Sequence, residues 1–394
     1  MNTIYLDNNA TTPLAPEVIA EMLPYLKEFY GNPSSMHTFG GQTHKKIEEA
    51  REKVAHLIGA DPEDVIFTSC GTESDNTAIM SAIESLPDKR HIITTRVEHP
   101  AVLNFCKHLS RKGFRTTFLP INSNGQLNID DLLKVLDEDT AIVSIMYANN
   151  ETGVIFPVNE ISEILKERGI LFHTDAVQAV GKIPIDLKKL HIDMLSLSGH
   201  KLHAPKGVGA LYVRKGTRFY PYIIGGHQEK GRRAGTENVA SIMGLGKACE
   251  LAMKNIYEEF AYLKRLRDKL ETSLLRLCPD VRINGDINNR LPNTTNISFE
   301  YVEGEAILLR LNEYGICASA GSACSSGSLE PSHVLKAMGI PFTAIHGSIR
   351  FSLSRYTTEE EIDRVIELMP TIITDLRMVS PFGKDKLKEI KCPK

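Results

Sequence analysis

Residues 170–213 read ILFHTDAVQAVGKIPIDLKKLHIDMLSLSGHKLHAPKGVGALYV, and this stretch decides the fold. It holds three short runs typical of buried strands, at Ile170–Asp175, Met194–Ser198 and Gly209–Val213. The first run ends in Asp175, and the second runs into Ser198-Gly199-His200-Lys201. Reactive side chains that follow strands indicate an α/β sheet, because such sheets bind ligands at the carboxyl ends of their strands.

The same alternation of strands and helices extends on both sides of this stretch, over roughly residues 40–220. Four further strands are predicted at Asp64–Ser69, His91–Thr95, Thr116–Pro120 and Ala141–Tyr147. Helical periodicity separates many of the strands, at Gln42–Ile58, Asp75–Leu86, Pro100–Arg111 and Val158–Arg168. The pattern predicts a mainly parallel sheet of seven strands with helices on both faces.

The pattern changes in the last third of the chain. Apolar residues recur every three or four positions from Ile256 to Leu277, which predicts a long helix. Beyond it, strands at Thr295–Phe299 and Ser348–Leu353 mix with helices at Gly304–Tyr314 and Thr358–Leu376. We therefore expect a large α/β domain over residues 16–258 and a smaller α+β domain made of residues 1–15 and 259–394.

Composition excludes several classes of protein. The 394 residues carry a net charge of −3, so a nucleic-acid partner is not expected. The seven cysteines contain no C-x-x-C pair, which argues against a disulfide framework or a Cys-rich zinc site and favours a reducing cytoplasm. No run approaches 18 apolar residues and the first residues do not resemble a secretory signal, so we expect no membrane segment. No resident metal is predicted.

A phosphate site is one interpretation of the segment Cys70-Gly71-Thr72-Glu73, which follows a strand and precedes a helix expected to begin near Asp75. Free N–H groups at the helix start and the Thr72 hydroxyl would suit a phosphate, and Gly71 leaves room for close approach. The alternative is an ordinary helix N-cap formed by Thr72 or Ser74. The segment alone favours this alternative.

Three other strand ends carry residues that suit pyridoxal phosphate. The Lys201 amine could form a Schiff base with an aldehyde cofactor. Asp175 could keep the pyridine nitrogen protonated, and the His99 imidazole could stack on the ring and move protons. Taken singly, they could equally be a loop lysine in water, a helix cap and a loop histidine. Four such strand ends in one sheet favour the cofactor site.

At this point a family resemblance becomes visible. The segments that carry it are YLDNNATTP (5–13), TSCGTESDN (68–76), VEHPAV (97–102), ANNETG (148–153), HTDAVQ (173–178), SGHKLHAPKGVGALYVR (198–214), RRAGTEN (232–238), GSACSSGSLEPSHVLKAMG (321–339) and SIRFSLSRYTTEEEID (348–363). Through them the chain resembles the pyridoxal-phosphate-dependent cysteine desulfurases of the NifS/IscS group, which are class-V aminotransferase-like enzymes. The resemblance implies the fold type I of pyridoxal-phosphate transferases, with the cofactor in the large domain.

The resemblance also implies a role for each matching residue. Lys201 would hold the cofactor, Asp175 would pair with the ring nitrogen and His99 would stack on the ring. The other implied cofactor contacts are Asn150 and Gln178 at the phenolic oxygen, and Gly71, Thr72, Ser198, His200 and, from the second subunit of a homodimer, Thr236 at the phosphate. Arg350, with Asn150, would bind the substrate carboxylate through a bidentate fork. Cys324 in the small domain would be the nucleophile.

Cys324 also stands out by its neighbours. It lies in AGSACSSGS (320–328), where every residue is small, and such a segment cannot pack a core. A free cysteine is usually buried, and an exposed thiol invites oxidation, so a functional role is favoured over chance. Cys70, Cys106, Cys249, Cys278 and Cys317 are interpreted as structural, and no catalytic role is expected for Cys392.

The implied reaction converts L-cysteine to L-alanine, with the sulfur captured as a persulfide on Cys324. An iron–sulfur scaffold protein of the NifU/IscU type would accept the sulfur, and Cys324 could contact an iron–sulfur cluster transiently. A selenocysteine lyase, a class-V aminotransferase and a sulfur-delivery platform are the alternatives. ETG after Asn150 and HKLHAP around Lys201 look closer to the nitrogen-fixation type, whereas Met378–Lys394 does not resemble the scaffold-docking end of the housekeeping enzymes.

Overall fold

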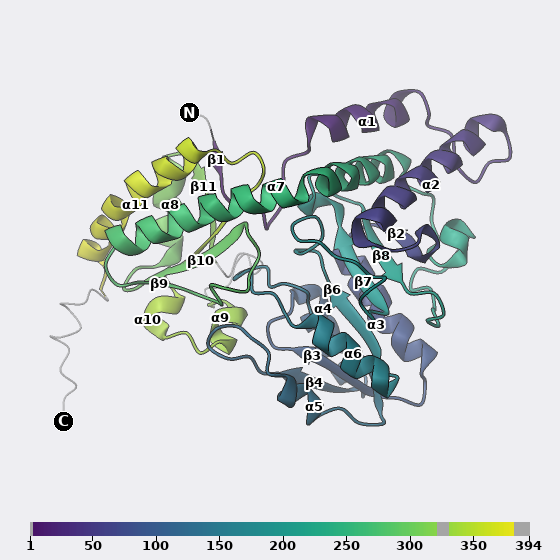
Figure 1. Ribbon diagram of the computed structural model, residues 1–394, viewed down its shortest axis with the longest axis horizontal. Helices are drawn as coiled ribbons and strands as arrows, with labels where there is room; N and C mark the ends of the chain where they lie inside the picture. Colours follow the sequence, from purple (N-terminus) through teal and green to yellow (C-terminus); the bar gives the residue numbers. More distant parts are fainter. Residues whose placement is uncertain (1–2, 321–330, 382–394) are drawn as a thin grey trace.

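A twisted seven-stranded sheet forms the centre of the larger part of the molecule (Figure 1). The computed structural model describes residues 3–320 and 331–381. The strands are β2 (Val65–Thr68), β3 (His91–Thr95), β4 (Arg115–Leu119), β5 (Thr140–Ser144), β6 (Leu171–Asp175), β7 (Met194–Ser198) and β8 (Gly209–Val213). Their order is β2-β8-β7-β6-β5-β3-β4, and only β8 runs antiparallel to its neighbours. All seven predicted strands and the mainly parallel sheet are confirmed.

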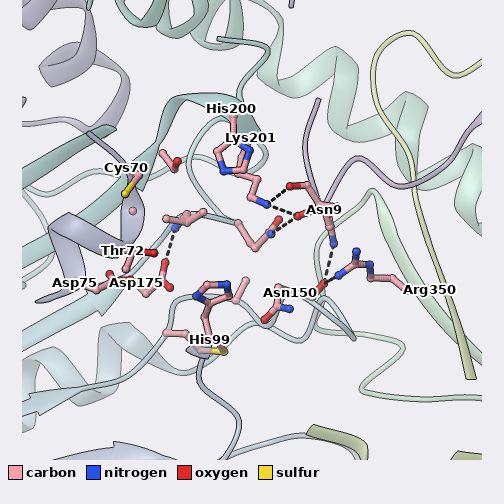
Figure 2. Close-up of a pocket in the computed structure, with 17 residues that line it drawn as sticks. Asn9, Cys70, Thr72, Asp75, His99, Asn150, Asp175, His200, Lys201 and Arg350 are labelled. Atoms are coloured by element: carbon pink, nitrogen blue, oxygen red, sulfur yellow. Dashed lines mark hydrogen bonds between the residues drawn. The ribbon is translucent and has the colours of Figure 1, made fainter. Parts of the chain in front are cut away.

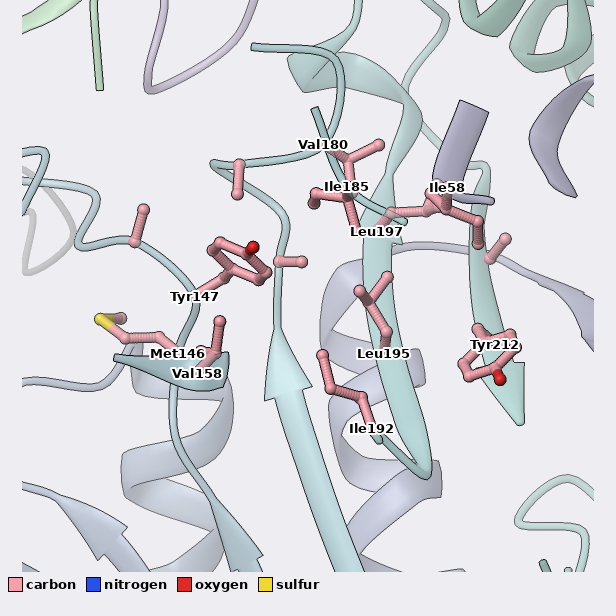
Figure 3. Close-up of a cluster of buried hydrophobic side chains, with 14 of the residues drawn as sticks. Ile58, Met146, Tyr147, Val158, Val180, Ile185, Ile192, Leu195, Leu197 and Tyr212 are labelled. Atoms are coloured by element: carbon pink, nitrogen blue, oxygen red, sulfur yellow. The ribbon is translucent and has the colours of Figure 1, made fainter. Parts of the chain in front are cut away.

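The sheet is buried on both faces, and this explains why its strands read as continuous apolar runs. Successive side chains point to opposite faces, so Ile92 and Ile142 join one apolar cluster while Ile93 and Val143 join the other. Figure 3 shows Leu195 and Leu197 of β7 in the second cluster with Tyr212 of β8.

Helices cover both faces. The helices of this part are α1 (Pro16–Lys27), α2 (Thr38–Ile58), α3 (Gly71–Ser85), α4 (Pro100–Arg111), α5 (Ile129–Leu133) and α6 (Val158–Arg168), with short 3₁₀ turns at η1 (Pro62–Asp64), η2 (Gly199–Lys201) and η3 (Gln228–Gly231). The predicted bounds of α4 and α6 are confirmed. The predicted start of α3 near Asp75 is wrong: the helix begins four residues earlier, because the Ser74 N–H already bonds the Cys70 carbonyl at 3.2 Å.

A second, antiparallel sheet lies in the smaller part of the molecule, in the order β12-β13-β10-β9. Its strands are β9 (Val281–Ile283), β10 (Thr294–Phe299), β12 (Ser319–Ala320) and β13 (Ser348–Ser352). The helices here are α8 (Gly304–Glu313), α9 (His333–Ala337), α10 (Phe342–Ile345) and α11 (Glu359–Val379). The strand β1 (Ile4–Tyr5) pairs in parallel with β11 (Ile316–Cys317), so the N-terminal residues also belong to this part.

One helix, α7 (Val239–Leu277), connects the two parts (Figure 1). Ala248 and Ala252 pack in the core of the large sheet, whereas Leu266 and Leu270 pack with β10 and β13. The predicted helix from Ile256 is therefore the second half of a longer one. The domain division at residues 258/259 stays a prediction; it falls between these two sets of core residues within α7, although Leu335 packs with the large core.

The segment from Asp7 to Thr12 joins the two sheets. Its Asn8 N–H bonds the Ser352 carbonyl of β13 at 3.1 Å, and its Thr12 N–H bonds the His200 carbonyl after β7 at 3.0 Å. This segment therefore crosses the carboxyl ends of the large sheet, where reactive side chains were predicted. None of the helices in the part of the chain that the structure describes is long and apolar enough to cross a membrane.

Candidate active site

A cavity of about 340 Å³ lies at the carboxyl ends of the central strands (Figure 2). The predicted residues that line it are Gly71, Thr72, His99, Asn150, Asp175, Gln178, Ser198, His200, Lys201 and Arg350. Thr236 is placed elsewhere, in a separate cavity of about 240 Å³. Cys324 lies outside the described residues. The fold therefore brings together the ten residues that one subunit was expected to contribute to the cofactor and the substrate carboxylate.

Lys201 reaches the cavity from the turn η2, directly after β7. Its Nζ donates hydrogen bonds to the carbonyl oxygens of Asn9 at 2.5 Å and Ala10 at 2.6 Å. Both acceptors belong to the segment that crosses the sheet, and neither is a carboxylate. An amine that lines a cavity is positioned to form a Schiff base with an aldehyde cofactor.

Asp175 ends β6 and lies opposite Lys201 across the cavity (Figure 2). Its Oδ1 accepts a hydrogen bond from the Val177 N–H at 2.9 Å. Burial raises the pKa of Asp175 to about 6, while the charge of Lys201 lowers it. Asp75, a residue of α3 that also lines the cavity, has its pKa raised well above the usual range by burial and by the charge of Asp175. Burial therefore disfavours the charged form of both carboxyl groups, and a negative charge on one disfavours a negative charge on the other.

His99 is the N-cap of α4 and lines the same cavity. Its Nδ1 accepts a hydrogen bond from the Ala101 N–H at 3.2 Å, so the proton of the neutral ring sits on Nε2. Burial and the charges of Lys201 and His333 lower the pKa of His99 to about 4. The imidazole is thus neutral near pH 7 and offers a flat face together with one N–H donor.

The N-terminus of α3 forms a cradle for an anion. Its N-cap residue, Cys70, makes no side-chain capping bond, which corrects the predicted alternative of a cap by Thr72 or Ser74. Among the described atoms, the buried hydroxyl oxygen of Ser198 has no hydrogen-bond partner, and Ser198 Cβ lies 3.5 Å from the position that a Cβ on Gly71 would take. A helix N-terminus with an unpartnered hydroxyl matches the needs of a phosphate group.

Arg350 enters the cavity from β13 in the second sheet. Its Nη1 donates to the Asn150 carbonyl at 3.0 Å and its Nη2 to Asp7 Oδ1 at 2.7 Å. The guanidinium is buried, and its Nε has no hydrogen-bond partner among the described atoms. A fixed guanidinium at the rim of a cavity can bind a carboxylate, as predicted for this residue.

Several residues of the site were missed. Asn9, Ala10, Cys70 and Asp75 also line the cavity. The interpretation of Cys70 as structural stays a prediction. Lys182 lies behind the cavity and contacts Gln178. The motif YLDNNATTP carried a signal for Asn9, but only the fold shows that this segment returns to the ends of β6 and β7.

A lysine, an acid and a neutral histidine around a cavity that also suits phosphate match what a pyridoxal-phosphate enzyme needs. The model of the aminotransferase class-V family matches residues 4–365. The chain belongs to this family, whose members of the cysteine desulfurase type depend on pyridoxal phosphate.

Relatives with known names cover nearly the whole chain. A cysteine desulfurase of Nostoc sp. is 64% identical over 386 residues, which are 98% of this chain and 96% of the relative. Cysteine desulfurase NifS of Azotobacter vinelandii is 57% identical over 383 residues, covering 97% of this chain and 95% of the relative. A solved structure of a NifS-like protein matches with a TM-score of 0.90 and 42% identity, covering 95% of this chain and 100% of that chain.

Proposed function

We propose that the chain is a cysteine desulfurase that converts L-cysteine to L-alanine and captures the sulfur as a persulfide on Cys324. The observation that carries this proposal is the meeting of Lys201, Asp175, His99 and Arg350 around one cavity. The identity of 64% to a cysteine desulfurase supports the same substrate. The cofactor, when bound, supplies an electron sink that makes the substrate Cα–H acidic and weakens the Cβ–S bond.

Residues of the chain would bind the substrate, accept its proton and hold the cofactor. Arg350 fixes the substrate carboxylate, and Lys201 Nζ accepts the Cα proton. The carboxylate of Asp175 would balance the positive charge of the cofactor ring, and His99 would stack on the ring. The N–H groups at the start of α3, with Thr72, Ser198 and His200, hold the phosphate. Asn150 and Gln178 complete the set as hydrogen-bonding partners of the phenolic oxygen.

Cys324 is the proposed sulfur acceptor. Its thiolate attacks the substrate sulfur, so that an S–S bond forms, the Cβ–S bond breaks and the electron pair of that bond remains on the substrate carbon. A proton then converts that carbon to the methyl group of alanine. Substrate thiol and enzyme thiol thus become alanine and an enzyme persulfide, and the atoms and electrons balance without an external oxidant.

The decisive experiment compares Cys324→Ala with Cys317→Ala. Cys317, in β11, does not line the cavity, so its replacement serves as the matched control. We expect both variants to keep the visible absorption of bound pyridoxal phosphate, while only Cys324→Ala fails to release sulfide from L-cysteine in the presence of dithiothreitol. Normal alanine formation by Cys324→Ala would contradict the proposed role. If the unaltered protein, given a 2-oxo acid as amino-group acceptor, formed 3-mercaptopyruvate instead of alanine, the result would favour an aminotransferase.

The chain is further proposed to act in the cytoplasm as a homodimer. Thr236 lines a cavity of its own chain that is distinct from the one around Lys201, which supports its action in the neighbouring site. The sulfur is proposed to pass to an iron–sulfur scaffold protein of the NifU/IscU type. Sedimentation equilibrium tests the dimer, and transfer of ³⁵S from Cys324 to such a scaffold tests the acceptor.

A further inference from the structure

Lys182 is a half-buried lysine directly behind the cavity, and no role was predicted for it. Its Nζ donates a hydrogen bond to Gln178 Oε1 at 2.7 Å and lies 3.5 Å from Asn9 Oδ1. Within residues 3–320 and 331–381 it forms no ion pair with a carboxylate. Burial, with the nearby charges of Lys201 and Arg350, lowers the pKa of Lys182 to about 7. A lysine in this position costs stability, which suggests that its contact with Gln178 has a use.

The backbone before Lys182 is shaped to bring it inward. Gly181 has a φ of +75°, a conformation that favours glycine. A Cβ at this position would overlap the side chain of Leu202. The turn after β6 therefore places Gln178 against the cavity and Lys182 behind it.

Two contacts fix the amide of Gln178 in one orientation. Lys182 Nζ donates to the amide oxygen, and the charged ammonium has no lone pair with which to accept from a flipped amide. The Asn9 carbonyl can only accept, and it faces the amide nitrogen of Gln178 at 3.0 Å. If the amide were flipped, its NH₂ group would face the Lys182 donor and its oxygen would face the Asn9 carbonyl. Neither hydrogen bond could then form. The second N–H of Gln178 remains as a donor for the cavity that this side chain lines.

Asn9 is itself held by several hydrogen bonds, so the carbonyl that Gln178 contacts has a defined position. Its Nδ2 donates to the Asn150 carbonyl at 3.1 Å and to Thr294 Oγ1 at 2.8 Å, and its Oδ1 accepts from Asn293 Nδ2 at 3.1 Å. The same Asn9 carbonyl that accepts from Gln178 also accepts from Lys201.

We propose that Lys182 is a positioning residue which, together with the Asn9 carbonyl, locks the Gln178 amide so that its remaining N–H is a hydrogen-bond donor to the cofactor. This proposal rests on the cofactor of the proposed function and not on its substrate. Pyridoxal phosphate binding is therefore its readout, and a wild-type protein that binds no pyridoxal phosphate would refute the proposed function instead.

The test is a double-mutant cycle on the full-length protein with pyridoxal phosphate as the probe. Lys182→Met, Gln178→Ala and the double variant are each stripped of cofactor and titrated, with the visible spectrum recorded at saturation. We expect Lys182→Met to weaken cofactor binding about tenfold and to shift the absorption maximum in the same direction as Gln178→Ala, because a charge-assisted hydrogen bond is lost. The double variant should lose no more affinity for pyridoxal phosphate than Gln178→Ala alone.

Two further variants separate positioning from folding. Gln178→Glu keeps an acceptor for Lys182 but has no N–H to give, so it should fold normally and bind cofactor as weakly as Gln178→Ala. Glu271→Gln breaks a buried ion pair outside the cavity and should leave cofactor affinity unchanged. Three outcomes would each overturn the proposal. They are a wild-type cofactor affinity and spectrum in Lys182→Met, a wild-type cofactor affinity in Gln178→Glu, and affinity losses of the two single variants that multiply in the double variant.

Discussion

Glu98 should make the stability of the cofactor-free protein fall as the pH rises. This residue precedes His99, is fully buried, and accepts hydrogen bonds from Thr95 Oγ1 at 2.7 Å and from the Met146 N–H at 3.1 Å. Burial outweighs these hydrogen bonds and raises the pKa of Glu98 from 4.5 to about 8. The folded protein therefore keeps a proton on Glu98 that the unfolded chain has already released.

The pKa difference between the folded and the unfolded state sets how the free energy of unfolding changes with pH. The folded pKa is raised, so the contribution of Glu98 is most favourable below pH 4.5 and is lost as the pH rises to about 8. Over most of this window the loss is about 1.4 kcal/mol per pH unit. Between about pH 6 and about pH 8 it amounts to roughly 2 kcal/mol, because the titration of the folded state begins to flatten the curve near its pKa.

The substitution Glu98→Gln isolates the contribution of Glu98 to the pH dependence of stability. The amide keeps the shape of the side chain and cannot titrate, while every other buried group titrates in both proteins and cancels in the difference. Urea unfolding of the two cofactor-free proteins, followed by far-UV circular dichroism, measures the free energy of unfolding at each pH. Between about pH 6 and about pH 8 we expect this free energy to fall by about 2 kcal/mol less in the variant than in the wild type. Parallel pH profiles for the two proteins would refute the reasoning.

Two further predictions concern other parts of the molecule. Arg350→Lys keeps the positive charge but loses the fork that contacts Asn150 and Asp7, so the KM for L-cysteine should rise by about 10-fold to 100-fold. An unchanged KM in steady-state assays would exclude Arg350 as the carboxylate anchor. Glu271→Gln leaves the buried Arg290 without its ion partner, now at 2.5 Å, and should lower the free energy of unfolding by about 3 kcal/mol. Urea unfolding measures this, and a loss within about 0.5 kcal/mol, as for a surface substitution, would contradict it.

The sequence was most informative where burial and periodicity coincide. The strands of the large sheet are buried on both faces, so each appears as a short apolar run, and chemically active residues such as Asp175 follow them directly. The helix α1 was missed because its apolar residues do not form one buried stripe: Ile19 and Leu26 are exposed, and Pro24 lies inside the helix. The two-residue strands β11 and β12 are too short for any period to show.

Side chains that act through distant contacts could not be predicted. Asn9 meets Lys201 across 192 positions of sequence, and no local pattern announces such a contact. Lys182 is close to Gln178 in sequence, but its inward direction depends on Gly181 and on the fixed position of Asn9. Local reasoning finds the groups that end a strand, whereas the groups that orient them become visible only in the assembled fold.

The crossing of the N-terminal segment has a consequence for the order in which the protein matures. Asn8 and Asn9 bond the backbone and the hydroxyl of Ser352, which lies 344 and 343 positions away in the chain. Asn9 also bonds Asn150 and Gln178 at the edge of the large sheet, and its carbonyl accepts from Lys201. The contacts around Lys201 are therefore complete only when both sheets have formed and docked against this segment. Folding of the large sheet alone leaves the cofactor site unfinished.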